Sequence, residues 1–372
     1  MELVVRKADL LRELALLQGI VDRKVTIPVL GNVLVDAEGA ELRLTATDME
    51  VGLRSRCEAS VAKPGHLTVP AKTLFEIVKN LPDTDVRIEQ DRAGVRVSAD
   101  RFDSRLQTLP ADDYPSLPTG VDEYRDVIDG ASLRHMIRKT QFAITAEDTR
   151  YFLNGALFVL RPGSMSLVAT DGHRLALVTV PRNGAVASGA GEGEEVRVLL
   201  AKKTLGELER LLAEGESEVH FSHTENHQFF KIGQRLLISR TNEGQFPAYD
   251  RVIPKANDQR VDFERDRLAG AIRRVKLLSN ERSRAVKLQF EPGQAEVTAA
   301  TDIGDAREVL LVEYGGPSLQ ICFNAQYILD FLNVVETEQV VLEFKDAASQ
   351  AVLRPVAAEG YDYLYVVMPM RV

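Results

Sequence analysis

The chain has 372 residues, of which 45% are hydrophobic and 27% are charged, and its formal net charge is -9. This length exceeds that of one compact core and predicts two or three domains. The composition is typical of a soluble globular protein, and no apolar run approaches the roughly 18 residues that a membrane-spanning helix needs.

The N-terminal residues show no basic region followed by an apolar stretch, so we expect no export signal and a cytoplasmic protein. Cys57 and Cys322 lie far apart in apolar segments, which suits inert thiols in a reducing compartment. The acidic net charge is unusual for a protein that grips the phosphate backbone tightly. Either DNA is not the partner, or the grip is not electrostatic alone.

In chain order, the first helix is predicted where Leu10, Leu14 and Leu17 recur at helical spacing, and alternation over 41–45 predicts a strand. This helix and its following strand open a pattern that recurs twice. The three copies cover 8–20 with 29–37, 131–144 with 153–161, and 266–278 with 284–292. A strand that leads into an amphipathic helix also recurs, at 69–81, 199–212 and 322–335.

A short motif repeats at nearly the same period. Ala-Thr-Asp recurs with its threonine at Thr47, Thr170 and Thr301, at intervals of 123 and 131 residues. A period near 125 residues is much longer than a solenoid repeat, so each unit should be a domain with its own core. The sequence therefore predicts three copies of one α+β domain, each with two helices packed on antiparallel sheet.

Turn-forming residues near Pro118 and Pro254 set the expected boundaries. The predicted domains are 1–120, 128–253 and 254–372, and a flexible loop is expected from Gly184 to Gly193.

Basic side chains recur on the polar faces of the predicted helices. Any one of them is most simply the solvated face of a surface helix, but as a set on equivalent helices they suggest one basic lining. Acidic residues are abundant in the strands and loops, so a protein that is acidic outside and basic inside could hold DNA by enclosure. The helix residues are Lys72, Lys79, Arg134, Arg138, Gln141, Lys202, Lys203, Arg210, Arg273 and Lys276.

Several segments closely resemble the bacterial DNA sliding clamp family, the beta subunit of DNA polymerase III. They are TIPVLGN (26–32), TRYFLNG (149–155), VATDGHRLAL (168–177), GQFPAYDRVIP (244–254) and YVVMPMRV (365–372). The resemblance covers essentially the whole chain in order. It implies a head-to-tail homodimer that forms a ring of six clamp domains around duplex DNA, without catalysis or cofactors. It also implies that the polymerase, the clamp loader, translesion polymerases and mismatch-repair proteins bind through short linear motifs.

The resemblance places a peptide-binding cleft between the second and third domains. Apolar walls of Leu, Val, Met and Pro suit such a site, because methionine adapts to ligands of several shapes. The matching residues are Arg150, Leu153, Thr170, Gly172, His173, Arg174, Leu175, Pro247, Val252, Val366, Met368, Pro369, Met370 and Arg371.

Two further sets follow from the same resemblance. The residues expected to contact DNA without sequence preference are Lys24, Lys72, Arg134, Arg138, Tyr151, Phe152, Lys202 and Lys203. The residues expected at the dimer contact are Phe102 and Leu106 in the first domain and Leu277 and Leu278 in the third.

The alternative is a hydrolase or metalloenzyme built on duplicated domains. His220, His223 and His227 could suggest a metal site, but a strand pattern and a turn separate them, so they need not converge. Asp171 and His173 are neighbours without a nucleophile elbow to complete a triad. No P-loop or dinucleotide-binding motif occurs. We therefore expect neither a metal site nor catalysis.

Overall fold

The computed structural model describes residues 1–21, 26–91, 94–121, 123–145, 148–182, 195–215, 218–242 and 244–371, without the side chains at 148, 149 and 151. The chain forms two compact units. Unit 1 contains Met1–Arg134 and Lys203–Thr241, and unit 2 contains His135–Asn183 and Asn242–Val372, with short additions from the 184–202 segment. The loop expected from Gly184 to Gly193 lies outside the described residues.

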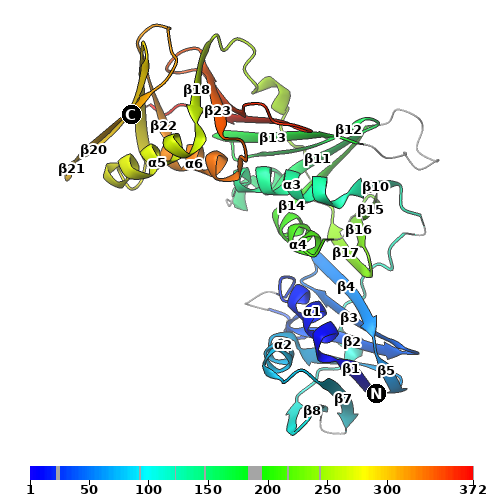
Figure 1. Cartoon of the computed structure of the whole chain (residues 1–372). Coiled ribbons are helices and arrows are strands. Elements are labelled where there is room, and N and C mark those ends of the chain that lie inside the picture. Colours follow the sequence, from blue (N-terminus) through cyan, green and yellow to red (C-terminus); the bar gives the residue numbers. More distant parts are fainter. Residues whose placement is uncertain are drawn as a thin grey trace. The chain divides into compact units, whose positions relative to one another are not determined.

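The first repeat carries two α-helices among nine strands (Figure 1). Its elements are β1 (Glu2–Arg6), α1 (Lys7–Leu17), β2 (Asn32–Glu38), β3 (Glu41–Thr47), β4 (Val51–Glu58), β5 (Ser60–Lys63), β6 (Gly65–Pro70), α2 (Ala71–Asn80), β7 (Asp85–Asp91), β8 (Gly94–Ala99) and β9 (Phe102–Leu106). Short 3-10 helices η1 (Pro28–Gly31) and η2 (Ala111–Asp113) complete it.

The second repeat has the same order of strands and α-helices as β1–β4 and β6–β9 of the first, and the position of β5 falls on residues 183–194, outside the described residues. Its elements are β10 (Asp126–Asp129), α3 (Gly130–Thr140), β11 (Gly155–Arg161), β12 (Ser164–Thr170), β13 (Arg174–Pro181), β14 (Val196–Ala201), α4 (Lys202–Leu212), β15 (Glu218–His223), β16 (His227–Ile232) and β17 (Arg235–Arg240). The 3-10 helices are η3 (Gln141–Ala143), η4 (Asp148–Leu153) and η5 (Tyr249–Arg251).

The third repeat has the same order of strands and α-helices as the second, with the single 3-10 helix η6 among its described residues. It contains β18 (Gln259–Glu264), α5 (Arg265–Val275), η6 (Lys276–Leu278), β19 (Ala285–Glu291), β20 (Gln294–Thr301), β21 (Gly304–Leu311), β22 (Leu319–Asn324), α6 (Ala325–Val334), β23 (Gln339–Phe344), β24 (Ala351–Pro355) and β25 (Asp362–Val367). The threefold repetition and the α+β class predicted from the sequence are confirmed.

The strands form four antiparallel sheets, and two of these sheets join successive repeats. In unit 1 the order is β10-β15-β16-β17-β4-β3-β2-β6, so β17 of the second repeat pairs with β4 of the first. In unit 2 the order is β14-β11-β12-β13-β25-β24-β23-β18, so β25 of the third repeat pairs with β13 of the second. The two smaller sheets are β5-β1-β7-β8-β9 and β21-β20-β19-β22.

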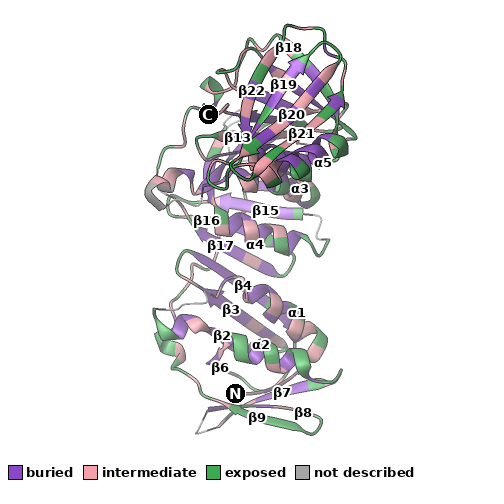
Figure 2. Ribbon diagram, turned by 90° about the vertical axis from the view of Figure 1, so that its left-hand side faces the viewer, coloured by how far each residue is buried: buried purple, intermediate pink, exposed green. Residues whose placement is uncertain are grey.

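The helices bury the apolar faces that their sequence periodicity predicts. Leu10, Leu14 and Leu17 of α1 are fully buried, where α1 packs on α2, β3 and β4. Each such leucine contributes about 1.5–3 kcal/mol relative to an exposed one. Figure 2 shows the buried central strands and the mixed burial of the helices. In the part of the chain that the structure describes, no helix is long and apolar enough to cross a membrane.

The first two Thr-Asp motifs form the same hydrogen-bonded turn. In the first repeat the hydroxyl of Thr47 donates to the carbonyl of Val51 (3.0 Å), and the carboxylate of Asp48 accepts from the backbone N–H groups of Glu50 and Val51. The turn residue Met49 has φ +80°, in the region that favours glycine. The third motif differs, because Thr301 pairs directly with Gly304 in a tight connection between β20 and β21.

A buried ion pair connects the first two repeats within unit 1. Glu13 of α1 accepts two hydrogen bonds from the guanidinium of Arg235, both 2.9 Å long, and one from Arg12. Its side chain is only 3% exposed. Burial alone would raise the pKa of Glu13, but the hydrogen bonds from Arg235 and Arg12 outweigh it, so the pKa lies below the ordinary value of 4.5. Glu13 is therefore ionised and holds Arg235 of β17 against α1.

We expect Glu13→Gln to lower the urea midpoint of unit 1, because it leaves the buried Arg235 with only Glu214 as an acidic partner. Removing one partner of a buried pair costs about 3–5 kcal/mol, and Glu214 places this loss at the lower end. The pKa of Glu13 is lower in the folded than in the unfolded protein, so the ion pair stabilises the fold fully above the ordinary pKa. This stabilisation is lost as pH falls through the pKa of Glu13 in the folded protein. The gap between wild type and variant should therefore narrow below pH 4.5.

Urea titrations of both proteins over a range of pH measure this difference. Glu89→Gln is the matched control, because Glu89 pairs with the exposed Arg87 on β7 and the change should leave the midpoint nearly unchanged. Equal midpoints for Glu13→Gln and wild type at neutral pH would show that the buried pair does not stabilise the junction.

Candidate functional site

The residues expected to line a peptide cleft all lie in unit 2, where the structure brings most of them together. They come from the end of β12, the turn into β13, the segment around η5, strand β25 and the residues after it. Leu175 of β13 faces Val366 of β25 in the strand pairing. The backbone N–H of Met368 then donates to the carbonyl of His173 (2.9 Å), which continues the pairing beyond the strand ends.

The turn between β12 and β13 repeats the geometry of the first Thr-Asp turn. The hydroxyl of Thr170 donates to the carbonyl of Arg174 (2.6 Å), and Asp171 accepts from the N–H groups of His173 and Arg174. Gly172 has φ +87°, which an L side chain rarely adopts. The turn leaves Gly172 and His173 exposed at the end of the sheet.

Arg150 contacts the backbone of this turn. Its guanidinium donates to the carbonyl of Asp171 (2.8 Å), and a Cβ on Gly172 would lie 3.1 Å from the same nitrogen. A side chain at 172 would therefore meet both backbone strain and Arg150. Leu153, at the end of η4, is buried beneath this region.

Arg174 is a fixed part of the site. Its guanidinium donates to Asp171 (3.1 Å), to Asp330 of α6 (2.5 Å) and to the carbonyl of Phe142 (2.6 Å). It also lies over the ring of Tyr327, 4.4 Å from the centroid. Burial favours the neutral form, but Tyr365 and the two carboxylates outweigh it and raise the pKa of Arg174. The side chain is 9% exposed, so these contacts position the turn and leave little of the guanidinium for a ligand.

The hydrogen bonds of Arg174 extend across the third repeat. Asp330 also accepts from the amide of Gln326 (2.7 Å), and the carbonyl oxygen of that amide accepts from the ammonium of Lys276 (3.1 Å). Lys276 begins η6, which carries the exposed Leu277. A continuous set of polar contacts thus connects η6 with the Thr170–Arg174 turn.

The apolar part of the site is a half-buried patch on a buried cluster. The cluster contains Leu157, Val159, Val168, Leu175, Tyr249, Val352, Leu364 and Val366. Four partly buried residues pack against it, and we call them the β13 patch: Leu177, Phe246, Val252 and Ile253. Leu175 is only 1% exposed, so it supports the patch from below rather than offering a surface.

Sequence reasoning missed three members of the β13 patch, namely Leu177, Phe246 and Ile253. Leu177 lies two residues after Leu175, and Phe246 and Ile253 flank the predicted Pro247 and Val252 within the quoted GQFPAYDRVIP segment. The strand period of two could have indicated Leu177. Met368, Pro369 and Met370 are half-buried and Arg371 is exposed. The N–H of Met370 donates to the carbonyl of Cys322 (2.8 Å) and anchors this end of the chain.

The residues expected to contact DNA have different environments. Lys72, Arg138 and Lys202 are exposed, and Arg134 and Phe152 are half-buried. Lys203 instead pairs with Asp48 and donates to the carbonyl of Ile20 (2.9 Å), so its ammonium serves the junction of the first two repeats. Lys24 and the side chain of Tyr151 lie outside the described residues.

The residues expected at a dimer contact lie at two sheet edges. In the described structure β9 and β21 each end a sheet with one side unpaired. Phe102 of β9 and Leu277 of η6 are exposed, and Leu106 and Leu278 are half-buried. Strand β21 adds exposed residues that sequence reasoning did not single out: Ile303 just before it, Val309, and Leu311, which is 86% exposed. The sequence signal is the apolar run Val309-Leu310-Leu311, because one face of a strand can bury only alternate residues of such a run.

The three candidate metal ligands of the alternative reading lie on neighbouring strands, His220 and His223 on β15 and His227 on β16. Within the ranges that the structure describes, no three His, Cys, Asp or Glu side chains are grouped as a metal would need. Burial raises the pKa of the Cys57 thiol to about 12, which removes it as a nucleophile near neutral pH.

Known protein families and individual relatives match this chain along nearly its whole length. Residues 1–118, 127–248 and 250–371 match the N-terminal, central and C-terminal domains of the DNA polymerase III beta subunit. The beta sliding clamp of Pseudomonas aeruginosa is 38% identical over 376 residues, and that of Caulobacter vibrioides is 36% identical over 382 residues. Both alignments cover 100% of each protein. A sliding clamp structure from P. aeruginosa, bound to griselimycin, superimposes with a TM-score of 0.93 at 37% identity and full coverage of both chains.

Proposed function

The chain belongs to the beta sliding clamp family, the beta subunit of DNA polymerase III, and we propose that two copies close into a six-domain ring that tethers the polymerase to duplex DNA. Proteins of this family are non-catalytic processivity factors, so the chain is not an enzyme. The proposed domains are 1–120, 128–253 and 254–372, and the proposed location is the cytoplasm.

The main support for ring closure is that equivalent strands recur in the three repeats. Strands β4, β13 and β21 occupy the same position in the three repeats, and β9, β17 and β25 are the last strand of each. Within the chain β4 pairs with β17, and β13 pairs with β25. The remaining members of the two sets are β21 and β9. A second copy can supply the missing partner, so that β21 of each chain pairs with β9 of the other.

The side chains at these edges suit such a contact. Exposed strand edges are normally protected, because unpaired backbone groups and apolar side chains promote association. Strand β21 instead presents Val309 and Leu311, next to Leu277 of η6, and β9 presents Phe102. A head-to-tail contact between different surfaces closes into a ring when the rotation permits it, and a dimer then contains two such contacts.

Enclosure explains how a protein with a negative net charge can remain associated with DNA. The net charge of -9 opposes tight binding to phosphates, whereas the exposed helix residues Lys72, Arg138 and Lys202 provide local positive charge. Diffuse contacts of this kind permit sliding, and the closed ring provides retention. Sequence-independent contact with the duplex is therefore the proposed role of these residues.

The β13 patch, with Met368 and Met370, is the proposed docking site for partner proteins. An extended motif ending in apolar residues would bury them against Leu177, Val252 and Met370, while exposed His173 and Arg371 lie near its polar end. Burying two such side chains contributes roughly 3–6 kcal/mol before ordering costs. The polymerase, clamp loader, translesion polymerases and mismatch-repair proteins would compete for this one site.

The first test of this proposal concerns ring closure. Leu311→Asp or Leu277→Asp should convert a dimer into folded monomers of 41.2 kDa, because each places a charge in the proposed β21–β9 contact. Both side chains are exposed within one copy, so the fold itself should survive. Light scattering measures the mass.

Met49→Asp is the control, because it changes another exposed apolar residue, in the turn between β3 and β4, which belongs to neither β9 nor β21. It should remain dimeric. Dimers of undiminished stability in both edge variants would refute the assignment of β21 and η6 to the interface.

The second test concerns the docking site. We expect a synthetic hexapeptide ending in Leu-Phe to bind with micromolar affinity, and Val252→Glu to weaken it at least tenfold, equivalent to about 1.4 kcal/mol. Val252 is half-buried, so it is a safer position than the fully buried Leu175. Calorimetry gives the dissociation constants.

Val127→Glu, an equivalent change on β10 of unit 1, should leave peptide affinity unchanged. Wild-type peptide affinity in a correctly folded, dimeric Val252→Glu variant would show that the docking site lies elsewhere.

A further inference from the structure

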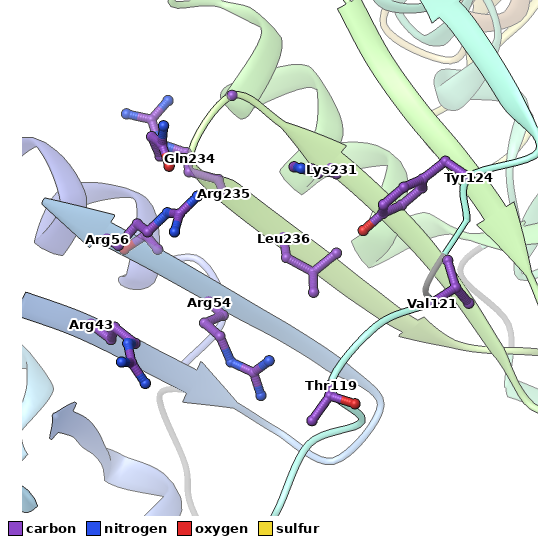
Figure 3. A pocket seen from close by; sticks show the side chains of 12 residues that line it. Arg43, Arg54, Arg56, Thr119, Val121, Tyr124, Lys231, Gln234, Arg235 and Leu236 are labelled. Carbon is purple, nitrogen blue, oxygen red and sulfur yellow. The ribbon is translucent and has the colours of Figure 1, made fainter. Parts of the chain in front are cut away.

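Unit 1 contains a polar cavity that plays no part in the proposed ring contacts or the β13 patch. Its volume is about 400 Å³, and it lies where β3 and β4 of the first repeat meet β16 and β17 of the second. The connector between the repeats provides Thr119, Val121 and Tyr124 (Figure 3). Ligand pockets commonly occupy about 300–1,000 Å³, so this cavity has room for a small molecule.

Strand register puts the main cationic groups of the cavity on one face of the sheet. Arg54 faces Leu236 in the β4–β17 pairing, and Leu236 faces Lys231 in the β16–β17 pairing. Side chains alternate between faces, and Arg235 lies on the opposite face, where it reaches Glu13 of α1. The cavity therefore opens on the face of the sheet away from α1, separate from the helices that carry the proposed DNA contacts.

The described lining residues include four arginines, one lysine and no carboxylate. Two of the arginines are paired with nearby acids on the face of the cavity, Arg43 with Asp36 and Glu38, and Arg56 with Glu41. The guanidinium of Arg235 lies on the opposite face, paired with Glu13 and Glu214.

Arg54 and Lys231 differ from the other cations. Among the described residues, neither has a carboxylate within ion-pairing distance. Arg54 makes a single long hydrogen bond, to the carbonyl of Leu117 (3.5 Å), and Lys231 lies 5.9 Å from the centroid of the Tyr124 ring. Burial and the nearby Arg43 lower the pKa of Arg54, as expected where positive charge is not compensated. The half-buried guanidinium of Arg54 thus has unused donors beside the cavity.

The remaining wall is apolar and aromatic. Leu236 and Val121 line the cavity, and Figure 3 shows the Tyr124 hydroxyl directed toward its interior. Burial raises the pKa of Tyr124, so the hydroxyl stays protonated and can donate a hydrogen bond. The cavity thus combines unpaired cations with a surface for a flat ring.

We propose that this cavity binds a small phosphorylated ligand of nucleotide size, with its phosphate on Arg54 and Lys231 and its ring system against Tyr124 and Leu236. A guanidinium presents a planar pair of donors that matches phosphate oxygens, and an ammonium adds a point charge. A volume of about 400 Å³ favours a small molecule over an extended acidic chain. Because β4 and β17 both line the cavity, the bound ligand also stabilises the junction of the first two repeats.

Calorimetry on the full-length protein tests the proposal with inorganic pyrophosphate, adenosine diphosphate and adenosine. Pyrophosphate and the diphosphate should bind, and adenosine should bind at least tenfold more weakly than the diphosphate. Tighter binding of the diphosphate than of pyrophosphate supports a nucleotide with its ring against Tyr124 and Leu236. Equal affinities leave phosphate recognition standing and overturn that placement of the ring.

Arg54→Ala should weaken pyrophosphate binding at least tenfold. Lys231→Ala should weaken pyrophosphate binding several-fold. Because Lys231 is exposed, its removal does not disturb the core, and this variant keeps the test valid if Arg54→Ala fails to fold. Lys63→Ala, an exposed lysine on β5, is the control and should bind as wild type. The proposal is overturned if pyrophosphate does not bind, if neither cavity variant weakens it, or if an oligoglutamate peptide binds through Arg54 and pyrophosphate does not.

Discussion

Backbone pairing between repeats is the constraint on which the rest of this structure depends. Each repeat ends in a strand, β9, β17 or β25, and two of these strands complete a sheet begun by the preceding repeat. Antiparallel pairing satisfies every backbone donor and acceptor along the shared edge, so repeats joined in this way act as one sheet. Among the strands equivalent to these pairing strands, β9 and β21 are left without a partner in the described chain. The tendency to assemble thus follows from the repetition itself.

The polar contacts at the two junctions are specific to each. At the first junction Glu13 binds Arg235, and Lys203 pairs with Asp48 of the first Thr-Asp turn. At the second junction the corresponding turn is held by Arg174, whose guanidinium reaches Asp330. Both turns are therefore tied into a junction between repeats, and the second also leaves Gly172 and His173 exposed at the end of the sheet. A continuous series of polar contacts from Lys276 to Asp171 connects this turn with η6, which lies at the proposed ring contact.

Local patterns allowed much of the fold to be predicted from the sequence. Helical spacing correctly indicated the buried leucines of α1, and the recurring Thr-Asp motif correctly indicated the repeats, because both depend on residues close in the chain. The roles of Lys203 and Arg174 could not be predicted in this way. Their partners, Asp48 and Asp330, lie about 155 residues away, so only the folded chain brings them together. Leu175 was expected to be a cleft wall, but its pairing with Val366 buries it.

Enclosure of DNA by a closed ring is the central claim, and topological retention tests it most directly. The protein is loaded by its clamp loader onto nicked circular DNA, and the bound fraction is measured by gel filtration before and after a single cut linearises the circle. Enclosure predicts stable retention on the circle and rapid loss from the linear product at unchanged ionic strength. Equal retention on both forms would show that affinity for phosphates, and not ring closure, holds the protein on DNA.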